Sequence, residues 1–160
     1  MNTGALQQHV YLHHNKPFER PVIIGSELVS FSALLTCRHL NIKPVAMLEE
    51  NAHISAPRPS DLIARFAFGV PVRTFTKLIA IEGRKNVEAV EIEYRGKRER
   101  ITCDGVIFTG LFRPETALMP TGLPSEKFSS AGNILGPLKT SGECWQQGVV
   151  AAQEIAKRLA

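Results

Sequence analysis

The strongest constraint on the fold is a glycine turn that links a short apolar run to an amphipathic segment. Residues 22–24 are β-branched and suit a strand that is buried on both faces, and Gly25 ends this run. Ser26 follows as a predicted helix N-cap, and residues 28–40 have the apolar spacing of a helix. A second apolar run, residues 45–48, comes next. A strand, a helix and a strand over about thirty residues form a βαβ unit, so we expect two adjacent parallel strands.

The hydrophobic pattern changes period in the second half of the chain. A short helix is predicted over residues 62–68. Three apolar or alternating segments then predict an antiparallel meander; they are residues 72–76, 78–81 and 87–94. The basic cluster of residues 95–100 is interpreted as a solvated hairpin tip. With a buried strand over residues 104–109 and a last helix after Gly142, the chain is predicted to be α/β, with a Rossmann-like parallel sheet and an antiparallel three-stranded meander.

Composition narrows the class of protein. The chain has 160 residues, of which 44% are hydrophobic and 21% charged, which is typical of globular domains and excludes a disordered chain or a coiled coil. The net charge of +4 is small and the charges are scattered, so we expect no nucleic-acid binding. No apolar run reaches the roughly 18 residues that a membrane helix needs, and residues 1–10 lack the pattern of a secretory signal. We therefore expect a soluble, cytoplasmic protein without a membrane partner.

The cysteine and histidine positions predict no metal site. Cys37, Cys103 and Cys144 lie far apart and form no CxxC pair, so we interpret them as reduced packing residues. His9 and His13 are four residues apart and could share a helix face, but no carboxylate or cysteine close by in the sequence completes a metal shell. An exposed histidine cluster is the preferred interpretation.

The glycine turn also suggests an anion site, because backbone N–H groups at a helix start favour a group such as pyrophosphate. Of the dinucleotide fingerprint G-x-G-x-x-G, only Gly25 is present. Glu27 stands at the second glycine position, where its carboxylate would repel a phosphate unless it turns away. Glu49 closes the second strand, where an acid holds the ribose hydroxyls and favours NAD over NADP. The alternative is a nucleotide-type fold whose cofactor site has decayed.

Three motifs, together with the order of the elements, carry a family resemblance. Residues 109–114 begin with Thr-Gly and end in Pro, residues 131–133 are Ala-Gly-Asn, and residues 140–148 form a Thr-Ser-Gly helix start. These segments resemble the return to the flavin domain, the Ala-Gly-Asp segment and the loop beside the flavin ring in the pyridine nucleotide–disulfide oxidoreductase superfamily. Residues 25–36 are most similar to the flavoprotein subunits of heteromeric amine, opine and proline dehydrogenases.

The resemblance implies a domain division and two cofactors. Residues 1–20 would form an N-terminal connecting segment, and residues 21–104 a nicotinamide-binding-type Rossmann domain. Residues 105–160 would be the C-terminal part of a flavin-binding domain. FAD and NAD are the implied cofactors. No catalytic side chain is expected, because the cofactors supply the hydride chemistry. The expected cofactor-binding residues are Gly25, Ser26, Glu27, Glu49, Gly110, Gly132, Asn133 and Gly142.

The chain resembles only the second half of such an enzyme. The first flavin-binding half is not found in it, and Asn133 replaces the acid of the Ala-Gly-Asp segment. We therefore expect an oxidoreductase module for electron transfer between a nicotinamide or amine-type substrate and flavin, inactive alone and lacking one or both cofactors when isolated. Its partner would be a complementary flavin-binding subunit or a second copy. The alternative is a non-catalytic Rossmann-type scaffold with a decayed cofactor site that serves protein association.

Overall fold

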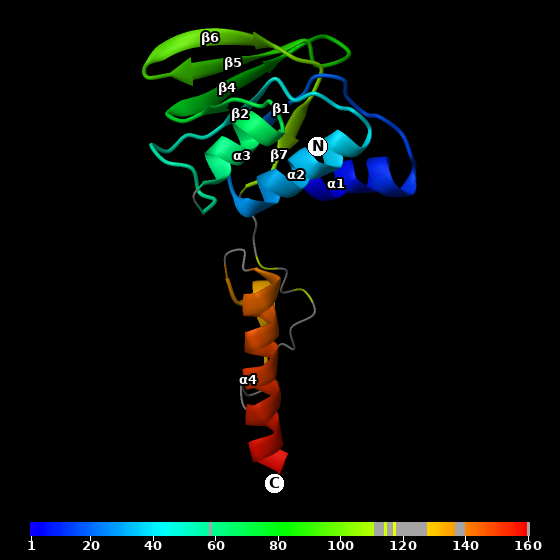
Figure 1. The fold of residues 1–160 in the computed structure, drawn as a ribbon, viewed down its shortest axis with the longest axis vertical. Coiled ribbons are helices and arrows are strands. Elements are labelled where there is room, and N and C mark those ends of the chain that lie inside the picture. The colour runs from blue at the N-terminus through cyan, green and yellow to red at the C-terminus, as the bar shows by residue number, and fades with distance from the viewer. Residues whose placement is uncertain (58, 111–113, 115–116, 118–127, 137–139, 160) are drawn as a thin grey trace. The chain divides into compact units, whose positions relative to one another are not determined.

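The computed structural model describes residues 1–57, 59–110, 114, 117, 128–136 and 140–159. Two compact units make up the chain, residues 1–110 and residues 111–160, and each is described by itself. The first unit contains all the described strands and the helices α1, α2 and α3 (Figure 1). The sequence predicts boundaries after residues 20 and 104 that separate a nicotinamide-binding part from a flavin-binding part. That division by cofactor stays a prediction.

A four-stranded parallel sheet forms the centre of the first unit. In the order β3-β2-β1-β7, its strands are β3 (Val72–Arg73), β2 (Ala46–Leu48), β1 (Val22–Ile24) and β7 (Val106–Phe108). Helix α2 (Leu28–His39) connects β1 to β2, and the register pairs Val22 with Ala46 and Ile24 with Leu48. The predicted βαβ unit and the α/β class are confirmed.

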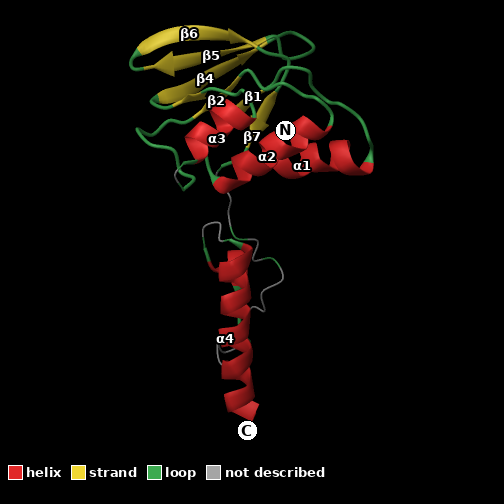
Figure 2. Ribbon diagram, viewed as in Figure 1, coloured by secondary structure: helices red, strands yellow, loops and turns green. Residues whose placement is uncertain are grey.

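Alternate residues of these strands face two different cores. Ile23 and Ile107 belong to a core that they share with buried residues of α1, α2 and α3. Their neighbours Val22 and Val106 belong to a second core, which they share with the antiparallel sheet. Because successive side chains of a strand point to opposite faces, a strand of three residues contributes to both cores. Figure 2 shows the resulting layers, with the helices on one side and the antiparallel strands on the other.

The antiparallel sheet consists of β4 (Thr76–Glu82), β5 (Ala89–Tyr94) and β6 (Lys97–Thr102). A three-stranded meander is confirmed, but the prediction of residues 72–76 as its first strand was wrong. Phe75 has a φ of +52°, which breaks the extended backbone within that segment. As a result β3 pairs in parallel with β2, and the meander begins only at Thr76.

Strand β6 begins inside the predicted hairpin tip of residues 95–100, so the placement of residues 97–100 at that tip was also wrong. All four residues are exposed, and the alternation that marks a half-buried strand is therefore missing from their sequence. Arg98 pairs with Glu91 at 2.9 Å and Arg100 with Glu82 at 2.7 Å. The basic cluster is solvated, as predicted, but it lies along a strand rather than at its tip.

The N-terminal residues contribute to the core of the first unit. Asn2 caps helix α1 (Thr3–Gln7) by accepting a backbone N–H, and the π-helical turn η1 (Gln8–Leu12) continues the helix. Leu6 and Val10, one turn apart, are both 0% exposed and belong to the core beneath α2. The sequence interpretation as a connecting segment missed this packing because most of the surrounding side chains are polar.

The helix starts differ in detail from the predictions. Glu27, not Ser26, is the N-cap residue of α2. Helix α3 (Ser60–Ala67) follows Pro59. In the second unit, the short 3₁₀ helix η3 (Gly132–Leu135) precedes α4 (Ser141–Leu159), so that Gly142 lies inside the first turn of α4. Among the described helices, none combines the length and the apolar character that a membrane span requires.

Replacing Leu6 by Ala should lower the free energy of unfolding by about 2–5 kcal/mol, because a fully buried side chain is lost and a cavity remains. Leu12→Ala is the matched control, since Leu12 is 71% exposed, and should change stability by less than about 0.5 kcal/mol. Urea unfolding followed by circular dichroism measures both variants. Equal effects would contradict the packing of the N-terminal helix into the core.

Candidate functional site

The carboxyl ends of β1, β2 and β7 meet at one edge of the parallel sheet. The chain passes from β1 to β2 and β3 on one side of β1 and returns as β7 on its other side, and α/β proteins bind ligands in the crevice where the strand order reverses in this way. The structure brings five of the predicted site residues to this edge: Gly25, Ser26, Glu27, Glu49 and Gly110. The other three, Gly132, Asn133 and Gly142, belong to the second unit.

Gly25 makes a turn that favours glycine for two reasons. Its φ is +110°, which residues with a side chain rarely adopt, and the space beside its Cα is occupied by neighbouring side chains. A Cβ at this position would lie 2.5 Å from Glu27 Oε2 and 2.6 Å from Thr109 Oγ1. The surface that a fingerprint glycine normally leaves open is therefore already covered by side chains of the chain itself.

The Glu27 side chain connects the ends of β1 and β7. Its carboxylate lies 2.5 Å from the Cβ position of Gly25 and 2.5 Å from that of Gly110. Ser30 Oγ and Thr109 Oγ1 both lie 3.3 Å from Glu27 Oε2, and these two buried hydroxyls are 2.6 Å apart. The carboxylate thus stays at the glycine turn instead of turning away from it.

Glu49 is buried, with 5% of the residue exposed, and both of its carboxylate oxygens are engaged. The Ser26 hydroxyl donates to Oε2, and the Ser55 hydroxyl donates to the same atom at 3.3 Å. The backbone N–H and side-chain amide of Asn51 donate to Oε1 at 2.9 and 2.8 Å. The acid that was predicted to hold a ribose therefore binds groups of its own chain. Ser26 does not cap α2, because its hydroxyl oxygen accepts the backbone N–H of Ser55.

These contacts hold residues 51–56, which we call the strap, against the turn after β1. The backbone N–H of Ser55 donates to Ser26 Oγ at 2.8 Å, and that of Ala56 donates to the Ser26 carbonyl at 2.9 Å. Asn51 and Ser55 were not singled out in the sequence. The only signal for them is that short polar side chains after an acid often bond to nearby backbone and side-chain groups.

As they lie, these residues do not fit the NAD that the sequence resemblance implies. A pyrophosphate at the start of α2 would face the Glu27 carboxylate, and two like charges about 4 Å apart repel by roughly 4 kcal/mol near a protein surface. The Glu49 oxygens are already bonded to the strap and to Ser26. Glu27 thus blocks the approach of a pyrophosphate to the backbone, and the contacts of Glu49 block the recognition of a ribose.

A small pocket remains at the same sheet edge, beside the strap. Its volume is about 260 Å³, below the roughly 300–1,000 Å³ of ordinary small-molecule sites. Its walls are the first part of the strap, the start of α3 and the end of β3, contributed by Ala52, His53, Ile54, Asp61, Val72 and Thr74. The pocket is too small for a whole dinucleotide.

In the second unit, the predicted flavin-contacting residues lie around η3 and the start of α4. Gly132 has a φ of +78°, and its N–H donates to Gln147 Oε1 of α4 at 2.8 Å. Asn133 Oδ1 lies 4.0 Å from Cys144 Sγ. The Asn133 side chain, at the position expected to face a flavin, thus lies beside Cys144 of the same unit.

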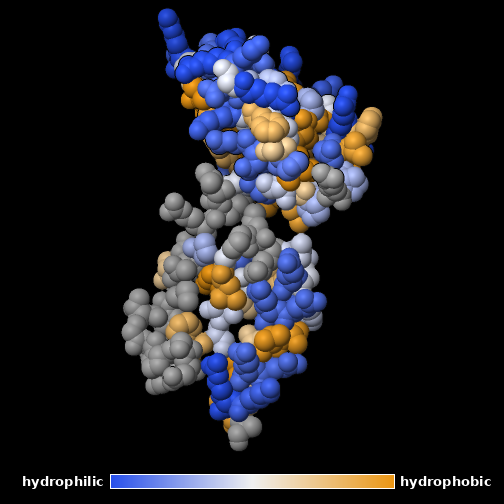
Figure 3. Space-filling view, turned by 90° about the vertical axis from the view of Figure 1, so that its left-hand side faces the viewer, coloured by the Kyte–Doolittle hydropathy of each residue, from blue (hydrophilic) through white to orange (hydrophobic). Residues whose placement is uncertain are grey.

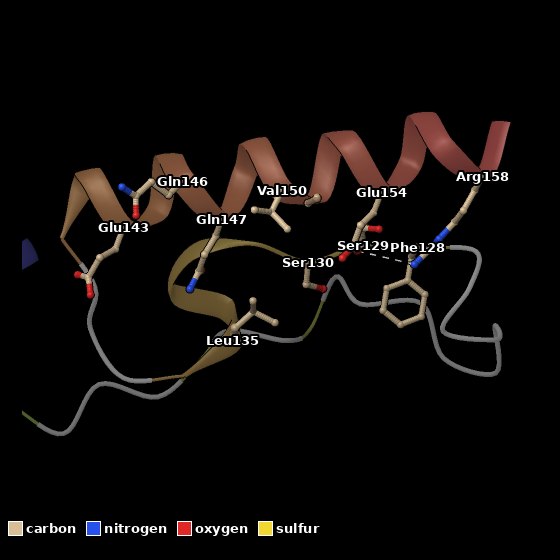
Figure 4. A pocket seen from close by; sticks show the side chains of 11 residues that line it. Phe128, Ser129, Ser130, Leu135, Glu143, Gln146, Gln147, Val150, Glu154 and Arg158 are labelled. Atoms are coloured by element: carbon tan, nitrogen blue, oxygen red, sulfur yellow. Dashed lines mark ion pairs between the residues drawn. The ribbon is translucent and has the colours of Figure 1, made fainter. Parts of the chain in front are cut away.

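A surface pocket of about 470 Å³ lies between η3, the segment before it and α4 (Figure 4). Phe128, Leu135 and Val150 are its large apolar members, and Gln147 reaches toward η3 from the helix. Glu154 and Arg158, 3.9 Å apart, form an ion pair one helical turn apart at its far end. No His, Cys, Asp or Glu cluster suited to a metal occurs in the described part of either unit.

No protein-family model matches the chain, and no curated protein matches its sequence. Solved structures do match its fold. The thioredoxin reductase of T. acidophilum is 20% identical with a TM-score of 0.71, over 97% of this chain and 57% of that one. The thioredoxin reductase of Lactococcus lactis is 15% identical with a TM-score of 0.64, over 86% and 52%. A FAD-dependent pyridine nucleotide–disulphide oxidoreductase from Desulfovibrio vulgaris is 19% identical with a TM-score of 0.55, over 72% and 29%.

The fold is therefore that of the FAD- and NAD(P)-binding domains of pyridine nucleotide–disulfide oxidoreductases. This chain spans about half the length of the two thioredoxin reductases and less than a third of the third protein. At sequence identities of 20% and below, these matches show a shared fold and not a shared function, since one fold serves many functions. The resemblance to amine, opine and proline dehydrogenases is not supported by these matches and stays a prediction.

Glu49→Ala should lower the free energy of unfolding by about 1–3 kcal/mol, because the buried Ser26 hydroxyl and the Asn51 N–H lose their acceptor. Glu50→Ala is the matched control, because the Glu50 ion pair with Lys77 is exposed and contributes less than about 0.5 kcal/mol. Urea unfolding measures the difference. If both variants were as stable as the parent, the network around Glu49 would not hold the strap.

The three thiols should differ in reactivity. Burial raises the pKa of the Cys37 thiol to about 12 and raises the pKa of the Cys103 thiol as well, whereas Cys144 is half-buried. Because the thiolate is the reactive form, only Cys144 should react rapidly with Ellman's reagent in the native protein, and all three cysteines in guanidinium chloride. Rapid reaction of three thiols in the native state would contradict the burial of Cys37 and Cys103.

Proposed function

We propose that the chain is a module of a FAD-dependent oxidoreductase of the pyridine nucleotide–disulfide type. The observation that carries this proposal is the topology of the first unit. A parallel sheet is interrupted after β3 by a three-stranded antiparallel meander, and β7 then returns to the sheet beside β1 and ends in Thr109-Gly110. The thioredoxin reductases compared above have the same fold over most of this chain.

In this proposal the module takes part in electron transfer between a nicotinamide or amine-type substrate and a flavin. Flavin and nicotinamide carry out the redox chemistry, and the protein holds them in place. The described residues do not make a flavin cradle alone, so a complementary flavin-binding subunit supplies the rest, and Gly110, Gly132 and Asn133 contribute to the completed site. The module acts in the cytoplasm, where its free cysteines stay reduced.

A second candidate function, a non-catalytic scaffold for protein association, is favoured by the surface of α4. None of the described residues of this helix is buried. Trp145 is 76% exposed and Leu159 is 83% exposed, and hydrophobic atoms are visible on the surface of this unit (Figure 3). Exposed apolar surface of this kind is typical of an interface with another chain or with a second copy.

One experiment separates the two candidates. The chain is co-expressed with a subunit from the same organism that contains a flavin-binding βαβ half, and the tagged chain is purified and examined for visible flavin absorption and for molar mass. The oxidoreductase proposal predicts a yellow complex of the two chains. A colourless chain that forms stable homo-oligomers would support the scaffold, and a colourless monomer would contradict both.

A matched pair of variants tests whether α4 makes the interface. Ile155→Asp places a charge at a half-exposed apolar position and should abolish the complex, because a buried unpaired charge is costly. Gln153→Asp makes the same charge change at a polar exposed position of the same helix and should leave the complex intact. Equal behaviour of the two variants would exclude this face of α4 from the interface.

A further inference from the structure

We propose that Glu27 is a specificity-determining residue that keeps nicotinamide dinucleotides away from the sheet edge around Gly25, Glu49 and Gly110, which we call the cleft. On this view the cleft has not decayed by losing its shape, because the strand, the glycine turn and the helix are all in place. It is instead filled by a carboxylate of the same chain. The inference rests on the proposed function only for its consequence, which is the class of the electron donor.

The first step concerns the charge at the start of α2. A helix N-terminus favours an anion, and the Glu27 carboxylate lies at this end of the helix. The Glu27 side chain accepts no hydrogen bond from the backbone of α2. It therefore acts on a pyrophosphate by covering the glycine turn and by repelling its charge.

The second step concerns the two glycines. Close approach of a pyrophosphate to the backbone requires open space over the glycine of the turn, here Gly25. Glu27 Oε2 and Oε1 lie 2.5 Å from the Cβ positions of Gly25 and Gly110, respectively, so one carboxylate covers both glycines. The Ser30 and Thr109 hydroxyl oxygens both lie 3.3 Å from Oε2, so the carboxylate lies against these two buried side chains.

The third step concerns the ribose end of the cleft. A carboxylate has about four acceptor positions. Glu49 receives hydrogen bonds from the Ser26 and Ser55 hydroxyls and from the backbone and side chain of Asn51. All of its acceptor capacity is used within the chain, so a ribose diol would have to displace the strap.

Removal of Glu27 should not disturb the remaining network. The Ser30 and Thr109 hydroxyls still bond to each other at 2.6 Å, and Thr109 Oγ1 still lies 2.9 Å from the Ile24 carbonyl oxygen. Glycine is well tolerated at a helix N-cap, and it restores the second glycine of the dinucleotide fingerprint. Glu27→Gly is therefore expected to open the cleft without unfolding the chain.

The consequence is a narrower substrate class. If the cleft excludes dinucleotides, the nicotinamide alternative within the proposed function falls away. The flavin that this module serves would then receive its electrons from an amine-type or other non-nucleotide donor that is oxidised elsewhere in the assembly.

The test is calorimetric titration of the full chain with NADH, with the parent, Glu27→Gly, Glu27→Gln and Glu50→Gln compared. The parent and Glu50→Gln should give no saturable binding at millimolar NADH. Glu27→Gly restores only the pyrophosphate end of the cleft, because Glu49 stays bonded to the strap, and it should bind NADH at least tenfold more tightly than the parent. Glu50→Gln is the matched control because it removes one exposed negative charge from the same sheet edge.

Thermal unfolding of each variant shows whether it folds. If Glu27→Gly does not fold, Glu27→Gln takes its place, because it removes the charge and keeps the size of the side chain. Glu27→Gln should bind NADH more tightly than the parent, but less tightly than Glu27→Gly. Micromolar binding of NADH to the parent, or binding by no variant of Glu27 that folds, would overturn the proposal. The NADH titration does not require flavin, whereas the co-expression experiment does. Failure of the proposal on Glu27 can therefore be distinguished from failure of the proposed oxidoreductase function.

Discussion

The burial of three very short parallel strands on both of their faces is the constraint on which the first unit depends. β1, β2 and β7 have three residues each, and the middle residue of each strand packs under the helices. The two neighbours in β1 and β2, and Val106 in β7, pack under the meander. A shift of one residue in register would exchange the two cores. The same register fixes where each strand ends, and it thereby places Gly25, Glu49 and Thr109 at one edge of the sheet.

At that edge, polar groups are held by one another. Ser26, Ser30, Glu49 and Thr109 are buried, and each has a hydrogen-bond partner within the chain. Buried polar groups are costly unless they are paired, so this network stabilises the strap and the turn together. It also uses the acceptors and the space that a dinucleotide would need. Stability of the edge and exclusion of a ligand are consequences of the same contacts.

The two units carry different kinds of evidence about function. The first has the topology of a nucleotide-binding domain, with a cleft that its own side chains fill. The second contributes a helix that buries none of its described residues within the unit and a glycine amide that is bonded to Gln147. A fold permits many functions, and here the side chains at the site, rather than the fold, separate an oxidoreductase module from a scaffold.

The sequence by itself determined the elements whose signal is local. The apolar runs at residues 22–24 and 45–48, the helix between them and a three-stranded meander were all predicted, because periodicity and a glycine break are visible within a few residues. Strands β3 and β6 were assigned wrongly, since a positive φ at Phe75 and two polar faces at residues 97–100 leave no such signal. Only the tertiary structure decided that Leu6 and Val10 reach the core, that Glu27 covers two glycines, and that Glu49 binds Asn51 and Ser55. These contacts join residues that are far apart in the sequence and that the parallel sheet brings together. The sequence shows that a residue is a glutamate, but it does not show which hydrogen-bond donors lie next to its carboxylate in the folded chain.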